Sequence, residues 1–219
     1  MAYATAAELR DRIGKVSPDK DTTLDALIAA AERSINTFTN RPDGFIADTI
    51  ASARIYSGSG KAHQLIDECA AITLVEVKDS ATDSTYTSWA AGDWIAFYGD
   101  AKAPEFQPLT RGKPYNAIMV DPTGTQSVFN TGAYFNGRSR AVPTVQITAR
   151  WGYALTVPVD IREACLMQAT RWYKRFEGAM SDALASGELG QLLYRQSLDP
   201  DVKHILVNGR YVKPAVGRW

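Results

Sequence analysis

The sequence has little of what marks a secreted, membrane-spanning or metal-binding protein. Cysteine is scarce: only Cys69 and Cys165 are present, far apart and without a CxxC partner. In a cytosolic chain such a pair predicts free thiols rather than a disulfide. Cys165 also falls on an apolar helical pattern, where a thiol is usually a small buried hydrophobe. Neither residue is a candidate metal ligand.

Long hydrophobic runs are also missing. No stretch approaches the roughly 20 consecutive apolar residues that span a bilayer. Residues 1–8 lack the basic start and apolar core of a signal peptide. We therefore expect a soluble protein, made in the cytoplasm, with no membrane partner. The composition, 45% hydrophobic and 22% charged, excludes a disordered or collagen-like chain.

An excess of either charge is absent as well. Lys and Arg number 24 and Asp and Glu number 24, so the formal net charge is zero. No overall positive field attracts the molecule to DNA or to an anionic membrane. The small self-repulsion of a neutral chain permits self-association.

What is present begins with two helical patterns near the N-terminus. Thr5 and Glu8 have the spacing of a capping box, which predicts a short helix that ends near Gly14. Thr22 and Asp25 predict a second helix start. An apolar stripe at helical spacing follows it, made of Leu24, Leu27, Ile28, Ala31, Ile35 and Phe38.

A third helical pattern opens at Pro158, because proline suits a first helical turn. Its apolar stripe predicts that Trp172 belongs to the core, and a further short helix is expected from Ser181 to Leu184. The full stripe is Ile161, Cys165, Ala169, Trp172 and Phe176. Arg171, Lys174 and Arg175 cluster on the other side of this helix. We interpret that cluster as a solvated or inter-subunit helix face in preference to a contact for DNA phosphates.

The middle of the chain has β-rich runs separated by glycine and proline turns. Strands are predicted at residues 50–56, 72–78, 94–98, 117–120 and 145–151. Residues 124–140 are read as a long loop or hairpin.

The predicted fold class is α+β. Residues 1–44 and 156–198 form a small helical bundle, in which the N-terminal and C-terminal helices pack together. Residues 45–155 form a β-rich antiparallel insertion, and residues 199–219 form an extended C-terminal tail.

Catalytic patterns are not found. Residues 57–62 resemble a phosphate-binding loop, but Ile55 stands where its first glycine belongs and Ala62 lacks the hydroxyl that would bind magnesium. A hairpin turn is therefore predicted there. His63, Asp67, Glu68 and Cys69 fit neither a nucleophile motif nor a paired zinc motif. We expect no enzymatic activity and no cofactor.

Aromatic residues crowd the β-rich block. Exposed aromatic rings serve as stacking platforms in carbohydrate-binding modules. Trp89 and Trp94 could have this role, so carbohydrate binding or adhesion by the β-rich block is an alternative function. A sandwich or barrel core is the preferred interpretation. Acidic residues outnumber basic ones in this block, which argues against nucleic-acid binding.

The C-terminal segment is basic and partly apolar, and Asn208-Gly209 between short apolar runs predicts a hairpin. Such a tail is typical of segments that dock into a partner. The candidate docking residues are Lys203, Ile205, Val207, Arg210, Tyr211, Val212, Lys213 and Trp219.

The order of these patterns resembles the head-to-tail connector (adaptor, or head-completion) family of tailed bacteriophages. The resemblance is carried by residues 7–10 and 24–35 before the β-rich stretch, and by residues 145–153 and 157–164 after it. It covers about residues 6–41 and 145–177, and the middle only loosely.

The resemblance implies a homo-oligomeric ring, typically dodecameric, beneath the portal protein at the head–tail interface of a virion. Such a ring extends the DNA channel without sequence-specific binding and provides a docking surface for a stopper or tail-completion protein. The C-terminal segment would contact the portal protein. A stopper or tail terminator is the alternative within the same class.

Overall fold

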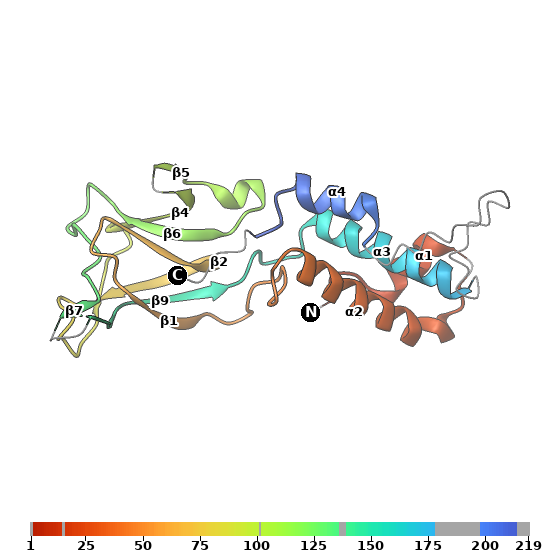
Figure 1. Cartoon of the computed structure of the whole chain (residues 1–219), viewed down its shortest axis with the longest axis horizontal. Coiled ribbons are helices and arrows are strands. Elements are labelled where there is room, and N and C mark those ends of the chain that lie inside the picture. The colour runs from red at the N-terminus through yellow and green to blue at the C-terminus, as the bar shows by residue number, and fades with distance from the viewer. Residues whose placement is uncertain (1, 15, 101, 136–138, 178–197, 214–219) are drawn as a thin grey trace. The chain divides into compact units, whose positions relative to one another are not determined.

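The computed structural model describes residues 2–14, 16–100, 102–135, 139–177 and 198–213. The chain forms two compact units (Figure 1). The helical unit consists of Met1–Phe45 together with Val157–Trp219, and the sheet unit consists of Ile46–Thr156. This is the mixed α+β architecture predicted from the sequence.

The helical unit contains four described α-helices and one short 3-10 helix. These are α1 (Ala6–Ile13), η1 (Pro18–Lys20), α2 (Asp21–Phe38), α3 (Val159–Glu177) and α4 (Pro200–Asn208).

The predicted capping box at the start of α1 is present. The Thr5 hydroxyl accepts a hydrogen bond from the Glu8 backbone N–H, and the Glu8 carboxylate accepts one from the Thr5 N–H at 2.9 Å. These bonds hold the pKa of Glu8 below its usual value. The helix ends before Gly14, as predicted. In contrast, α2 begins at Asp21 rather than after Thr22, because the 3-10 turn at Pro18 leads directly into it.

The two ends of the chain pack against each other through α2 and α3. Ile28 of α2 and Cys165 of α3 are both buried, and the Cys165 Sγ lies 3.9 Å from the Ile28 carbonyl oxygen. The α1–α3 contact is closed by ion pairs from Arg12 to Glu163, at 2.5 Å, and from Arg162 to Glu8. The predicted helical bundle, built from both chain ends, is therefore confirmed.

One core residue of α3 differs from the prediction. Trp172 is only half-buried, whereas the neighbouring Tyr173 is fully buried. The buried positions Ile161, Cys165 and Ala169 continue at a spacing of four to Tyr173. Four residues turn a helix by slightly more than one full turn, so the buried stripe winds gradually around α3 and leaves Trp172 at its edge.

The C-terminal prediction is wrong for the residues that the structure describes. Instead of an extended tail with a hairpin, Pro200–Asn208 form α4. Asp199 caps the helix by accepting from the Asp201 N–H, and Pro200 occupies the first turn. Asn208-Gly209 ends the helix rather than turning a hairpin, since the Gly209 N–H bonds the Ile205 carbonyl. Residues 214–219, including Trp219, lie outside the described residues, as does the helix expected at residues 181–184.

The sheet unit is built from antiparallel strands (Figure 1). The seven-stranded sheet has the order β1-β9-β2-β6-β4-β5, with β3 paired to β2. A separate hairpin pairs β7 with β8. The strands are β1 (Ser52–Ser57), β2 (His63–Val77), β3 (Thr87–Ser88), β4 (Trp94–Asp100), β5 (Ala103–Glu105), β6 (Tyr115–Val120), β7 (Ala133–Phe135), β8 (Ser139–Ala141) and β9 (Pro143–Trp151).

The long strand β2 joins the two halves of this sheet. Its first residues pair with β6, where His63 faces Met119, and its later residues pair with β9, where Val77 faces Val145. The main buried cluster of this unit includes Val75, Val77, Trp89, Ile118, Val120, Phe129, Val145, Ile147 and Trp151.

One sequence expectation for this unit changes. All five predicted strands are present, but β1 pairs with β9 and not with β2, so residues 57–62 are not a hairpin turn. The chain leaves β1 and crosses to β2 because β9 lies between them. Residues 124–140, read as a loop or hairpin, contain β7 and the start of β8, which pair antiparallel, so the hairpin alternative agrees with the structure. Among the described residues, no helix is long and apolar enough to cross a membrane.

Candidate functional site

The polar residues near the start of β2 form a structural network. The Asp67 carboxylate accepts from Arg54 Nη1 at 2.8 Å and from the Tyr56 hydroxyl at 3.1 Å, so it ties β2 to β1. The Arg54 guanidinium also lies over the Trp151 ring at 4.6 Å. In the described part of the chain, no three His, Cys, Asp or Glu side chains could hold a metal ion together.

Both cysteines are buried and free. Burial raises the pKa of each thiol to about 12, because the charged thiolate loses its hydration. Such thiols are protonated at neutral pH and are unsuited to act as nucleophiles.

Several aromatic residues of the sheet unit, Trp89, Phe129 and Trp151, belong to its core. Trp89 is 7% exposed, and its ring packs on Phe129 with centroids 4.9 Å apart. Trp94 is partly buried against the same cluster. A sugar needs an open ring face for stacking, so the stacking role considered for Trp89 is contradicted by its burial.

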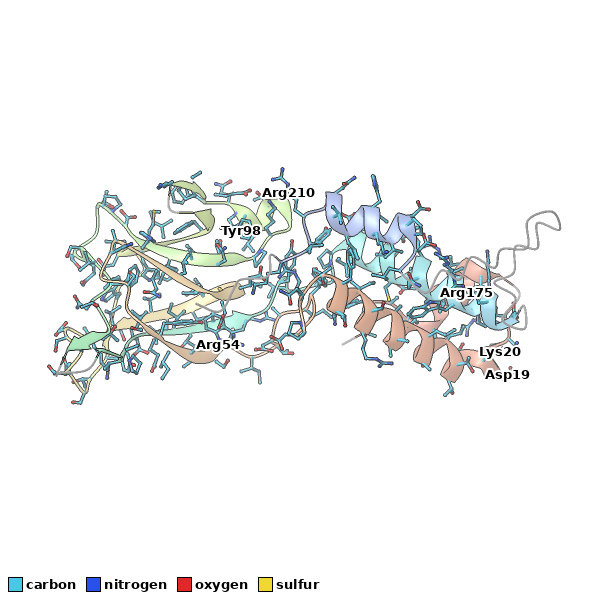
Figure 2. All side chains as sticks on the ribbon, viewed as in Figure 1. Asp19, Lys20, Arg54, Tyr98, Arg175 and Arg210 are labelled. Atoms are coloured by element: carbon cyan, nitrogen blue, oxygen red, sulfur yellow. The ribbon has the colours of Figure 1, made fainter. Side chains whose placement is uncertain are left out.

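The basic cluster of α3 lines a cleft in the helical unit. The cleft has a volume of about 470 Å³ and lies between α3, the start of α4 and the end of α1. Its lining residues are Arg12, Met167, Thr170, Arg171, Lys174, Arg175, Asp199 and Asp201. Figure 2 shows Arg175 at the same end of the unit as Asp19 and Lys20.

The three predicted cations of this cleft have different surroundings. Arg171 pairs with Asp199 at 2.8 Å within the same chain, so it fixes the start of α4 rather than being open to a partner. Beneath it, the buried Gln168 accepts from the Asp199 N–H at 2.9 Å. Lys174 is exposed, and Arg175 is half-buried.

The residues predicted for docking lie on α4 and in the segment that follows it, and they differ in how far they are buried. Tyr211 is 8% exposed and cannot serve as a free docking residue. Its hydroxyl donates to Asp160 at 3.0 Å, and its carbonyl accepts from Arg41 Nε at 2.8 Å. Its ring packs edge-on against Phe45. These contacts attach the chain after α4 to the body of the unit.

The remaining candidates stay accessible to different degrees. Val207 is 53% exposed and Val212 is 37% exposed, and Arg210 is also exposed. Lys203, Ile205 and Lys213 are half-buried. Figure 2 places Arg210 at the opposite end of the helical unit from Arg175. The structure therefore separates the two predicted surfaces.

Sequence reasoning missed the residues that complete the cleft. Arg12 comes from α1, and Asp199 and Asp201 come from the first residues of α4. The Asp-Pro pair at Asp199 was a usable signal, because an acid followed by proline is typical of a helix start.

No protein-family model matches the chain, and no curated protein matches it either. Among solved structures, it is similar to a chain of one described as "Virion of native gene transfer agent (GTA) particle". The two chains have 18% sequence identity and a TM-score of 0.45, over 98% of this chain and 92% of that chain. A similarity of this size carries no conclusion about function.

Proposed function

We propose that the protein is a structural component of a tailed-phage type of virion, a head-to-tail adaptor that forms a ring under the portal protein. The observation that carries the proposal is the construction of the helical unit. Its two halves come from the two ends of the chain, and the sheet unit is inserted between them in the sequence. The family resemblance found in the sequence implies helices in the same order on either side of a β-rich stretch.

The ring would extend the DNA channel and offer a surface to a stopper or tail-completion protein. Its contact with the portal protein is assigned to the exposed side of α4 and the turn after it. Val207, Arg210 and Val212 form this portal-contact surface, and all three are exposed. Tyr211 is excluded because its contacts lie within its own unit.

Electron microscopy of the protein mixed with the portal protein of the same particle tests the proposal. We expect a ring of this chain bound to the portal ring. Val207→Asp combined with Arg210→Glu should weaken portal binding by at least about tenfold, because it adds a buried charge and reverses another. Lys61→Glu, on an exposed residue of the sheet unit, is the matched control.

Two outcomes would count against different parts of the proposal. A chain that binds the portal protein as a monomer, or not at all, contradicts the adaptor role. Rings that form equally well with the double variant contradict only the assignment of the portal-contact surface.

A further inference from the structure

Strand β1 forms one margin of the seven-stranded sheet (Figure 1). It pairs with β9 on one side, and in the described part of the chain no strand pairs with its other side. Residues on this margin are accessible: Ala53 is exposed, Ile55 is 58% exposed, and Ile50, just before the strand, is 81% exposed. The margin is therefore an edge to which another strand can add through backbone hydrogen bonds.

The hydrogen bonds of β9 show which backbone groups of β1 are turned outward. The Thr144 carbonyl accepts from the N–H of Lys78, the residue after β2, at 2.8 Å, so the backbone groups of Thr144 point to β2. Successive residues of a strand point their backbone groups to alternate sides, so those of Ile147 point to β1. Trp151, four residues further on, follows the same alternation, because its carbonyl accepts from the N–H of Asp48, which precedes β1, at 2.7 Å.

Two residues of β1 therefore direct their backbone groups away from the sheet. Arg54 is opposite Ile147 in the β1–β9 register, so its N–H and C=O groups point to β9. Ala53 and Ile55, on either side of Arg54, point theirs in the other direction. Within the described residues, none of these four outward groups has a hydrogen-bond partner. The edge thus offers donors and acceptors at the spacing that an added strand requires.

The strands at the two ends of this sheet differ in their protection against such pairing. At the far end, β5 has three residues and contains Pro104, which has no N–H to donate. In contrast, β1 has six residues and no proline. Its one charged residue, Arg54, pairs with Asp67 at 2.8 Å and lies over the Trp151 ring, so it is held by its own sheet and does not guard the edge. The β1 edge is therefore better suited to strand addition than the β5 edge.

We propose that the β1 edge binds an extended segment of the stopper protein, which adds one strand to the sheet beside Ala53 and Ile55. This inference rests on the proposed adaptor function and names the contact with that partner. A row of alternating backbone donors and acceptors is complementary to an extended polypeptide. A second copy fits poorly, because two β1 edges pair only as a two-fold dimer, which does not build a ring, and the β5 edge is blocked by Pro104. The portal protein is already assigned to the exposed side of α4.

Ile55 indicates which side chains the added strand carries. Its partner in β9 is Gln146, whose side-chain amide donates to Glu76 at 2.8 Å. Val145 and Ile147, on either side of Gln146, are buried in the core, so Ile55 lies on the opposite face of the sheet. An apolar side chain on the added strand, placed beside Ile55, would remove that exposed surface from water. We therefore expect the bound segment to have an apolar residue at this position.

Amide hydrogen exchange of the full wild-type chain, resolved by residue, tests the added strand with and without the purified stopper protein of the same particle. The Ala53 and Ile55 amides should exchange at least about tenfold more slowly in the complex, because they acquire acceptors. The Arg54 amide, which points to β9 in both states, is the internal control and should change by less than about threefold. Unchanged exchange at Ala53 and Ile55, or no complex with the stopper protein, overturns the inference.

The variant Ala53→Pro tests the same contact by removing one outward N–H. Proline is tolerated where the N–H of an edge strand faces away from the sheet, so the sheet unit should stay folded. Binding of the stopper protein should weaken by at least about tenfold. Ala53→Val keeps the N–H and is the matched control, with binding within about threefold of the wild type. Equal binding by Ala53→Pro and Ala53→Val overturns the inference. Should circular dichroism melting show that Ala53→Pro is less stable than the control, the exchange measurement on the wild type decides.

Three outcomes separate this inference from the proposed function. Portal-bound rings that bind the stopper protein without protection of the Ala53 and Ile55 amides overturn the added strand and leave the adaptor role intact. A chain that forms no ring with the portal protein, but shows this protection with the stopper protein, contradicts the adaptor role and supports the edge contact. Protection of the two amides in a dimer of the chain alone assigns the edge to a second copy and overturns the inference.

Discussion

At the scale of single residues, Tyr3 shows how a few atoms connect distant segments. Its hydroxyl donates to Asn36 Oδ1 at 2.7 Å and accepts from the Phe45 N–H at 2.9 Å. Gly44, between these partners, has φ of 77°, and a Cβ there would lie 2.4 Å from the Tyr3 hydroxyl oxygen. The chain therefore leaves the helical unit through a turn that only glycine fits.

Tyr3→Phe should make the protein less stable at neutral pH by about 1–3 kcal/mol, because the buried Phe45 N–H loses its acceptor. Burial raises the pKa of Tyr3 to about 12 from an ordinary value of 10. Between pH 10 and 12 the unfolded tyrosine ionises and the folded one does not, so the wild type loses stability as pH rises. Phenylalanine has no such loss.

The difference in free energy of unfolding between wild type and variant should therefore narrow by about 1–2 kcal/mol across that window, with allowance for screening by solvent. Urea denaturation at a series of pH values measures it. A difference that stays constant across the whole window would contradict the assigned role of the Tyr3 hydroxyl.

At the scale of elements, α4 is stabilised by its contacts with the rest of the helical unit. It has nine residues, too few for a stable isolated helix in water. Val202 and Leu206 are buried on one side, and the Arg171–Asp199 pair fixes its start. After the helix, the Lys213 N–H bonds the Thr39 carbonyl at the end of α2.

Leu206→Ala should destabilise the protein by about 2–5 kcal/mol, because it opens a cavity beneath α4. Val207→Ala, one residue further on and 53% exposed, is the matched control and should change stability by less than about 0.5 kcal/mol. Chemical denaturation compares the two. Equal, small effects would mean that α4 is not part of the folded helical unit.

At the scale of the whole molecule, the sheet unit is inserted into the helical unit through adjacent chain segments. Ile46 forms a parallel bridge with Ala154, and the Ala47 N–H donates to the Ala154 carbonyl at 2.8 Å. The sheet unit also has a core of its own, which includes Trp89, Phe129 and Trp151. An insertion whose ends meet and whose core is internal meets the physical conditions for folding alone.

A fragment of residues 46–156 should therefore fold independently, with dispersed amide signals in NMR spectra and a single cooperative denaturation transition. A fragment that begins at Gly58 is the control. It lacks β1, leaves the edge of β9 unpaired, and should lose both properties. A fragment 46–156 with collapsed, undispersed spectra would show that the sheet unit depends on the helices.

The residues that form the surfaces assigned to assembly could be predicted only in part from the sequence. Val207 could be selected from sequence because hydropathy is a local property, and its side chain is exposed. The role of Arg171 could not, since its partner Asp199 is 28 residues away along the chain. Tyr211 was misassigned for the same reason: its contacts are with Arg41, Phe45 and Asp160.

The amino-acid sequence by itself determined the elements with local causes. The capping box at Thr5, the end of α1 at Gly14 and the buried stripe of α2 depend on residues within a few positions of one another. Tertiary structure alone decided that β9 lies between β1 and β2, and that α4 packs on α3 rather than extending away. Strand order and docking depend on burying apolar surface shared by distant segments, and no local pattern records which segments will meet.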